Sequence, residues 1–218
     1  MKVLAYTANL GGFDELVAPV PQEGLEVDYV AFTDADLPSR SRAMTPRLRA
    51  RIPKMFGWDL RPGYDAYLWH DASLQLSKPD SVRWFLDQLG VATIAVFKHP
   101  WRSSAAEEAD FLRMKLAKGS RYIHARYAGE DLDGQMRAIT QPWYWDDKLY
   151  ASGAFCYRPG SRIENAMKEW WYHTSRFHVI DQLAFPFALR FGGCEVRVID
   201  EDIYHASHLA WTRRTHHG

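Results

Sequence analysis

The sequence predicts an α/β fold in which helices cover both faces of a mainly parallel central sheet. Short apolar runs of strand length alternate with segments of helical periodicity along the whole chain. This alternation is typical of parallel strands joined by helical crossovers. The 218 residues contain no repeat, linker or low-complexity tract, so we expect a single domain over residues 1–218, large enough to bury a full core.

Hydrophobic patterning and end signals assign the elements. Strands are expected at residues 2–7, 27–32, 64–70, 93–97, 150–157 and 196–199. Helices are expected at residues 81–89, 104–118, 132–139, 163–176 and 181–191. Ser104 and Glu107 have the spacing of a capping box at the start of the second helix. Pro186 is expected to interrupt the last helix.

The composition argues against several classes of protein. The 27 Lys and Arg residues balance 27 Asp and Glu residues, so no overall field steers the chain to nucleic acid or to an anionic membrane. Two cysteines are too few for a disulfide scaffold or a thiolate zinc site. No signal peptide precedes the first strand, and no apolar run approaches the roughly 20 residues of a membrane span. We therefore expect a cytoplasmic protein without a membrane span.

Three of the predicted strands end in polar groups. The first ends at Thr7 and Asn9, the second at Asp34, and the third at Asp71 and Ser73. Open α/β sheets bind ligands at the carboxyl ends of their strands. An aspartate in such a place is also a common turn former, so the convergence of three polar ends, rather than any one of them, predicts a site.

Asp71-Ala72-Ser73 has the form of a degenerate Asp-x-Asp motif. A nucleoside diphosphate gains negative charge as its bond to a sugar breaks, and Mg²⁺ or Mn²⁺ held by carboxylates neutralises that charge. Ser73 stands where a second acid is expected, so another ligand is needed, and His205 or His208 is the natural source. The candidate metal ligands are therefore Asp71, Ser73, His205 and His208.

A basic segment follows the second strand. Its six cationic residues are Arg40, Arg42, Arg47, Arg49, Arg51 and Lys54. Arginine binds phosphate through a planar fork and lysine binds it as a point charge, so Arg51 and Lys54 are candidates for contact with a diphosphate or its sugar. The alternative is a solvated basic face on a helix. Pro53 is expected to break any long helix through this segment.

Two later segments carry further candidates. His99-Pro100-Trp101-Arg102 follows a strand, and we expect Arg102, Glu107 and Glu108 to point into one cleft. Glu107 is also the acid of the capping box, so Glu108 is favoured as the functional residue. Asp181, followed by Gln182, opens the last predicted helix. Asp181 is a candidate base for an acceptor hydroxyl, or a ligand for donor hydroxyls; interaction with the helix N-terminus is its structural alternative.

Taken together, these residues resemble a family of glycosyltransferase-like domains found in plant mucilage and pollen-turgor proteins and in bacteria and phages. The resemblance rests on segments in the family's order at residues 6–14, 32–34, 50–54, 64–73, 99–102, 108–109 and 181–182. It implies a GT-A-type, Rossmann-like sandwich, a nucleotide-sugar donor and a divalent metal on Asp71. It places Asp181 near the reacting centre. The candidate donor-binding residues are Thr7, Ala8, Asn9, Asp34, Arg51, Lys54, Asp71 and Gln182. One departure is His70, where the family's pattern more often has an aliphatic residue.

The leading hypothesis is a glycosyltransferase that moves a sugar from a nucleotide donor to a hydroxyl of a glycan or, as a second choice, of a modified nucleic acid. An alternative is a non-catalytic nucleotide-sugar or carbohydrate-binding module. A hydrolase ranks last, because it would usually need more carboxylates. An inverting enzyme would use Asp181 as its base, whereas a retaining enzyme would not need one. The aromatic runs at residues 143–145 and 170–172 are candidates for stacking on an acceptor.

Overall fold

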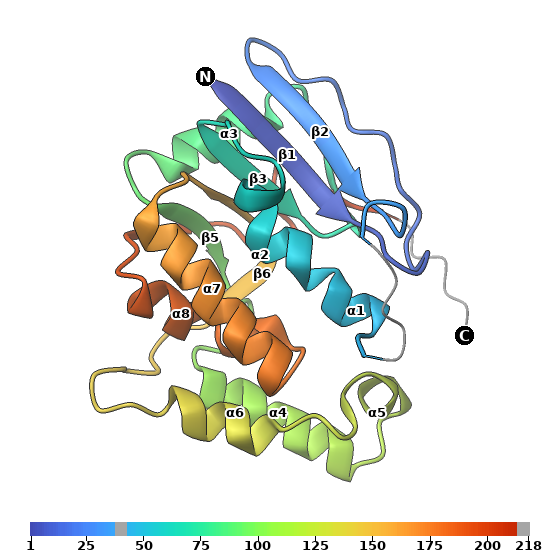
Figure 1. The fold of residues 1–218 in the computed structure, drawn as a ribbon, viewed down its shortest axis with the longest axis vertical. Coiled ribbons are helices and arrows are strands. Elements are labelled where there is room, and N and C mark those ends of the chain that lie inside the picture. Colours follow the sequence, from blue (N-terminus) through green and yellow to red (C-terminus); the bar gives the residue numbers. More distant parts are fainter. Residues whose placement is uncertain (38–42, 213–218) are drawn as a thin grey trace.

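The computed structural model describes residues 1–37 and 43–212, and its centre is a six-stranded sheet (Figure 1). The strand order is β2-β1-β3-β6-β5-β7. The strands are β1 (Lys2–Ala8), β2 (Glu26–Phe32), β3 (Ala66–His70), β5 (Ile94–Lys98), β6 (Tyr150–Tyr157) and β7 (Val196–Ile199). All neighbours pair in parallel except β6, which is antiparallel to β3 and β5. The predicted α/β class with a mainly parallel sheet is confirmed.

Each face of the sheet has its own hydrophobic core. Leu4 and Tyr6 of β1 belong to one core, and Val3 and Ala5 belong to the other, because successive strand residues point to opposite faces. Helices α2 (Arg51–Leu60), α7 (Ser161–Arg176) and α8 (Phe185–Phe191) cover the first face. Helix α3 (Ser81–Leu89) and a small antiparallel pair, β4 (Leu74–Leu76) with β8 (Leu209–Trp211), cover the second.

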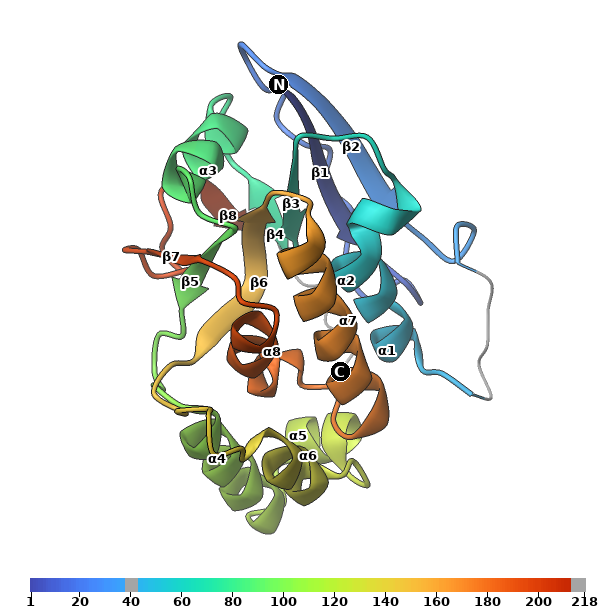
Figure 2. The same ribbon diagram turned by 60° about the vertical axis from the view of Figure 1, so that its left-hand side comes forward.

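Three further helices form a layer at one end of the molecule in both views (Figures 1 and 2). They are α4 (Ala105–Ala117), α5 (Arg121–Tyr127) and α6 (Leu132–Ile139). The predicted cap of α4 is present, because the Ser104 hydroxyl accepts a hydrogen bond from the Glu107 amide. Helix α4 also packs against the 3-10 turn Asp181–Leu183 that precedes α8. This contact ties the layer to the edge of the sheet where the candidate site lies.

The basic segment is more helical than the sequence predicted. It contains the short helix α1 (Pro46–Arg49), and α2 begins directly after Ala50. No long helix runs through the segment, as predicted, but the division falls at Ala50 and not at Pro53. Pro53 lies in the first turn of α2, where a backbone N–H has no partner within the helix. Arg40 and Arg42 lie outside the described residues. Pro186 similarly lies in the first turn of α8, and the predicted helix at residues 181–191 divides at Ala184.

Within residues 1–37 and 43–212, no helix is long and apolar enough to cross a membrane.

Candidate active site

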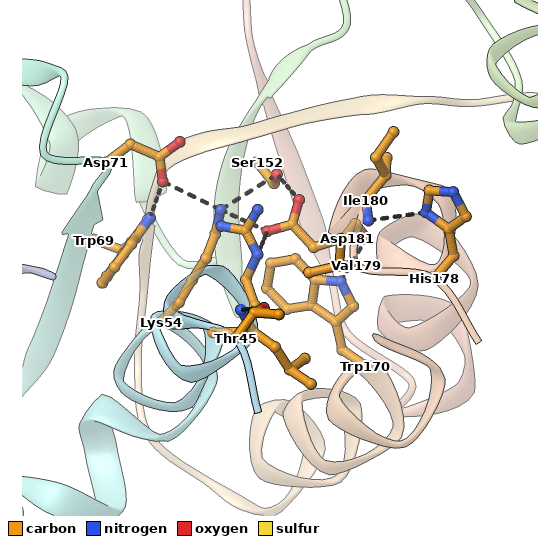
Figure 3. Close-up of polar contacts among 12 residues, drawn as sticks. Thr45, Lys54, Trp69, Asp71, Ser152, Trp170, His178, Val179, Ile180 and Asp181 are labelled. Atoms are coloured by element: carbon orange, nitrogen blue, oxygen red, sulfur yellow. Dashed lines mark hydrogen bonds and ion pairs between the residues drawn. The ribbon is translucent and has the colours of Figure 1, made fainter. Parts of the chain in front are cut away.

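The centre of the candidate site is a buried lysine. Lys54 Nζ lies 2.7 Å from Asp181 Oδ2 and 3.3 Å from Asp71 Oδ1, so it points between the two carboxylates (Figure 3). It also lies 3.4 Å from the hydroxyl of Ser152. Only 1% of the Lys54 side chain is exposed. A buried ammonium needs such partners, because removal of a charge from water is costly.

Arg51 joins the same cluster from one turn earlier in α2. Its Nε lies 3.2 Å from Asp181 Oδ2, and the three-residue spacing places Arg51 and Lys54 on one face of the helix. Neither Arg51 Nε nor Asp181 Oδ2 has good hydrogen-bond geometry within the cluster, so charge attraction rather than directed hydrogen bonding holds these ion pairs. Asp181 Oδ1, by contrast, accepts a hydrogen bond of 2.8 Å from Ser152.

These contacts set the charge state of Asp181. Burial alone raises the pKa of the Asp181 carboxyl, but the charges of Arg51 and Lys54 outweigh burial and hold this pKa below its usual value. Asp181 is therefore ionised at neutral pH and is a weak base. Its backbone carbonyl accepts a hydrogen bond from the buried indole of Trp170, which fixes the turn (Figure 3).

Asp71 is the accessible acid of the cluster. Its side chain is 38% exposed, against 6% for Asp181. Oδ1 accepts a hydrogen bond of 3.0 Å from the indole of Trp69, and the Asp71 amide donates to the carbonyl of Gly153 at 2.7 Å. A Cβ on Gly153 would lie 3.6 Å from Oδ2, so the glycine leaves space beside this second oxygen.

A second polar cluster adjoins the first. Glu108 pairs with the Nε of Arg102 through Oε2, and its Oε1 accepts a hydrogen bond of 2.7 Å from Gln182. The structure thus brings together Arg102 and Glu108, and adds Gln182, the neighbour of Asp181 in the chain. Burial raises the pKa of the Glu108 carboxyl, although Arg102 and Gln182 oppose this shift.

The residues expected at the nucleotide are divided between the two faces of the sheet. Thr7 and His70 line an apolar cavity of about 310 Å³ on the α3 face, with Leu16, Tyr29 and Leu74. Ala8 packs against the core of the opposite face, where Lys54 lies. Successive strand residues point to opposite faces, so Thr7 and Ala8 lie apart although both were expected at the donor nucleotide.

Asn9 and Asp34 hold the loops that follow β1 and β2. The Asn9 side chain accepts a hydrogen bond from the Asp14 amide at 3.3 Å. Asp34 accepts one of 2.8 Å from the Gly11 amide and pairs with the buried Arg49. Both residues are thus engaged in loop structure.

His70, the departure from the family pattern, is also held by backbone. Its Nδ1 lies 2.8 Å from the carbonyl of Leu74. Burial lowers the pKa of the His70 imidazole, so the ring is neutral at neutral pH and Nδ1 carries the proton that Leu74 accepts.

The structure does not assemble the predicted metal ligands. Within the described part of the chain, no three His, Cys, Asp or Glu side chains are grouped closely enough to hold a metal. His205 Nδ1 lies 3.2 Å from Asp202, and His208 stacks on Trp84. Ser73 contributes its backbone carbonyl to a hydrogen bond with the amide of Thr212.

The remaining donors do not fit a metal ion held by the protein alone. Asp71 Oδ1 already faces two donors, the Lys54 ammonium and the Trp69 indole. A divalent cation at this oxygen would also meet the repulsion of that ammonium. Hard cations are held by several oxygens, and Oδ2 of Asp71 supplies one.

Sequence reasoning missed Ser152 and a stack of three aromatic rings. Ser152 is a polar residue in an otherwise apolar strand, and that signal could have found it. The rings of Trp101, Tyr204 and Trp211 stack on one another, but they come from three separate segments, and no local pattern joins them. Of the predicted aromatic candidates, Trp170 is a core residue, whereas Trp143 and Trp145 are exposed.

No family model matches the sequence, and no curated protein is significantly similar to it. Among solved structures, the bifunctional glycosyltransferase WbbM is similar over 80% of this chain and 28% of its own, with 12% identity and a TM-score of 0.46. Mouse xyloside xylosyltransferase 1 is similar over 80% of this chain and 63% of its own, with 10% identity and a TM-score of 0.41. The galactosyltransferase LgtC, in complex with donor and acceptor sugar analogues, is similar over 91% of this chain and 73% of its own, with 9% identity and a TM-score of 0.40. The chain thus spans less than two thirds of the length of WbbM and of xyloside xylosyltransferase 1.

Proposed function

We propose that this protein is a glycosyltransferase that binds a nucleotide-sugar diphosphate at Arg51 and Lys54 and transfers the sugar to a hydroxyl acceptor. The observation that carries the proposal is the Lys54 ammonium, buried at the edge of the sheet where β3 ends, beside the accessible carboxylate of Asp71. A lysine that only filled the core would have no reason to lie at this edge, which is where open α/β sheets bind ligands.

The charges of the cluster indicate how a diphosphate would enter. Arg51 and Lys54 are opposed by Asp71 and Asp181, so the cluster is formally neutral. Asp181 is the closer and more buried partner of Lys54, whereas Asp71 is more distant and exposed. Phosphate oxygens would therefore replace Asp71 at Lys54, while Asp181 remains as the fixed counter-ion.

Asp181 fits a positioning role better than that of a base. An ionised carboxylate with a lowered pKa takes up a proton poorly at neutral pH. Its ion pairs with Lys54 and Arg51 instead keep both cations at the site, and its hydrogen bond with Ser152 holds the carboxylate in place. The role proposed for Asp181 is therefore to position the cations of the donor site, rather than to serve as a base or as a ligand for donor hydroxyls.

Because Asp181 is a weak base, one alternative remains, a binding module without turnover. One experiment separates the two functions. A panel of nucleotide sugars is tested for thermal stabilisation of the protein and for transfer or hydrolysis, with Mn²⁺ and with EDTA. A cognate donor stabilises the folded state by mass action.

We expect stabilisation by at least one donor, loss of that stabilisation in Arg51→Gln, and turnover of the donor. Stabilisation without turnover would support the binding module. Absence of any stabilisation under both conditions would refute both functions. Comparison of the measurements in Mn²⁺ with those in EDTA shows whether a cation bound to the donor contributes to stabilisation or to turnover.

A further inference from the structure

Three aromatic rings from distant segments form a continuous stack. The ring centres of Trp101 and Tyr204 are 4.9 Å apart with an interplanar angle of 27°. Those of Tyr204 and Trp211 are 5.0 Å apart with an angle of 9°. Trp101 follows β5, Tyr204 lies between β7 and β8, and Trp211 ends β8. The fold therefore builds one surface from three loops or strand ends.

The outer ring of this stack is unusually exposed for a tryptophan. Tyr204 covers one face of Trp101, yet 65% of Trp101 is exposed, so much of the indole is accessible to solvent. Exposure of a large apolar ring is unfavourable, and exposed apolar surface of this kind often marks a binding site. Tyr204 behind it limits the orientations that the indole can adopt.

Both sides of the stack connect to the candidate site. Trp101 directly precedes Arg102, which pairs with Glu108. Glu108 in turn accepts a hydrogen bond from Gln182, the residue that follows Asp181. Tyr204 directly follows Ile203, whose Cδ1 would lie 3.2 Å from a Cβ on Gly153, next to the Asp71 carboxylate. The stack therefore borders the polar cluster.

The surroundings of the stack define the ligand that it fits. The Arg102 guanidinium lies over the Trp101 ring, 5.9 Å from its centre, and supplies hydrogen-bond donors beside the apolar surface. An apolar plane with polar groups at its edge complements a pyranose ring, which has an apolar C–H face and hydroxyls around it. Asp200, Glu201 and Asp202 lie two to four positions before Tyr204 in the chain, and this acidic run would repel the phosphates of a nucleic acid, which bind basic grooves.

We infer that Trp101, backed by Tyr204, is the acceptor platform and binds a pyranose ring of a neutral glycan. This inference rests on the proposed glycosyltransferase function and names the class of its acceptor. The hydroxyl to be glycosylated would then lie at the ring edge, toward the cluster of Arg102, Glu108 and Gln182. A modified nucleic acid, the second acceptor class open in the sequence, does not fit the acidic border.

The test uses a panel of neutral gluco-, galacto-, manno- and xylo-oligosaccharides as probes. Binding is measured by saturation-transfer NMR and titration on the wild-type protein, Trp101→Ala and Trp101→Phe. Tyr122→Ala, which removes another exposed ring on α5, is the matched control. A single-stranded oligonucleotide is the probe for the competing class.

We expect at least one oligosaccharide to bind, and Trp101→Ala to weaken its binding at least about tenfold, which is about 1.4 kcal/mol. Trp101→Phe should retain most of the affinity, and Tyr122→Ala all of it. Donor stabilisation should be unchanged in all three variants. Failure of every oligosaccharide to bind, an equal loss in Tyr122→Ala, or Trp101-dependent binding of the oligonucleotide would overturn the inference.

The outcome is distinguishable from failure of the proposed function. If donors stabilise the protein but Trp101→Ala has no effect on oligosaccharide binding, the platform is refuted and the donor site stands. If an oligosaccharide binds through Trp101 but no donor binds, the surface is a carbohydrate site and the transferase proposal is refuted.

Discussion

The ammonium group of Lys54 lies 2.7 Å from the carboxylate of Asp181, and both side chains are buried. The pair joins α2 to the 3-10 turn before α8, which are 127 positions apart in the chain (181 − 54). It therefore contributes to the fold as well as to the candidate site, and the two contributions can be separated by mutation.

Replacement of Lys54 by methionine should destabilise the protein by about 3–5 kcal/mol, because Asp181 would lose its closest counter-charge while still buried. Arg51, which also pairs with Asp181, should keep the loss toward the lower end of this range. The free energy of unfolding in urea measures the effect. The double variant Lys54→Met/Asp181→Leu should recover much of the stability. A double variant less stable than Lys54→Met would show that the unpaired Asp181 carboxylate is not the cause of the lost stability.

Replacement of Asp71 by asparagine should affect the fold little and should strengthen donor binding in the absence of added metal, because the neutral amide no longer competes with phosphate for the Lys54 ammonium. The amide oxygen can still accept from Trp69, and the carboxylate is partly exposed, so its ion pair with Lys54 is screened by water and contributes less than about 1 kcal/mol. Thermal shift with a cognate donor measures binding. Asp80→Asn, at an exposed acid beside His208, is the control and should bind donor normally. A large loss of stability in Asp71→Asn without donor would contradict this division of roles.

Mn²⁺ alone should leave the melting temperature of the protein unchanged, because Asp71 provides one available oxygen and the Lys54 ammonium lies beside it. Thermal melts with and without Mn²⁺, in the absence of nucleotide, test this expectation. A clear stabilisation by Mn²⁺ that disappears in Asp71→Asn would show that the protein holds the metal by itself.

Two glycines should respond differently to alanine. A Cβ at Gly57 of α2 would overlap the buried ring of Tyr6, so Gly57→Ala should destabilise the protein by about 1–3 kcal/mol or more despite its better helix propensity. A Cβ at Gly153 meets side-chain atoms at 3.2 Å or more. Gly153→Ala should cost less stability but weaken donor binding, because its methyl group fills the space beside Asp71 Oδ2. Urea unfolding and donor titration of both variants check the two effects.

Stability should fall as the pH is lowered from about 6.5 toward 4. Burial lowers the pKa of His173 and of His178 to about 4, and burial with the nearby Arg102 lowers that of His99 to about 4. The unfolded chain takes up protons near pH 6.5, while the folded protein does not, so protons favour unfolding within this window. Each of these three histidines should lower the free energy of unfolding by about 1–2 kcal/mol at pH 5, relative to neutral pH.

His178→Asn gives a direct check of this pH dependence. The asparagine oxygen can replace Nδ1 as the acceptor for the Ile180 amide, but it does not titrate. The free energy of unfolding, measured from pH 7.5 to pH 5, should fall less steeply in this variant. An unchanged slope would show that His178 does not contribute.

The sequence by itself determined the class of the fold and predicted the edge of the sheet at which we propose the site. Periods of two and of 3.6 residues mark strands and helices locally. The positions of the six sheet strands along the chain and the cap at Ser104 could therefore be predicted. The polar ends of β1, β2 and β3 also follow from positions close in sequence, as does the proximity of Arg102 and Glu108.

Only the tertiary structure decided which of these residues meet. It placed Thr7 on the face of the sheet opposite Lys54, and it paired His205 and His208 with acids other than Asp71. It also brought Ser152 to Asp181 and Tyr204 to Trp101, across segments that no local pattern connects. The physical reason is that packing and charge pairing act through space between distant segments, whereas sequence patterns report the local backbone and the face on which a side chain lies.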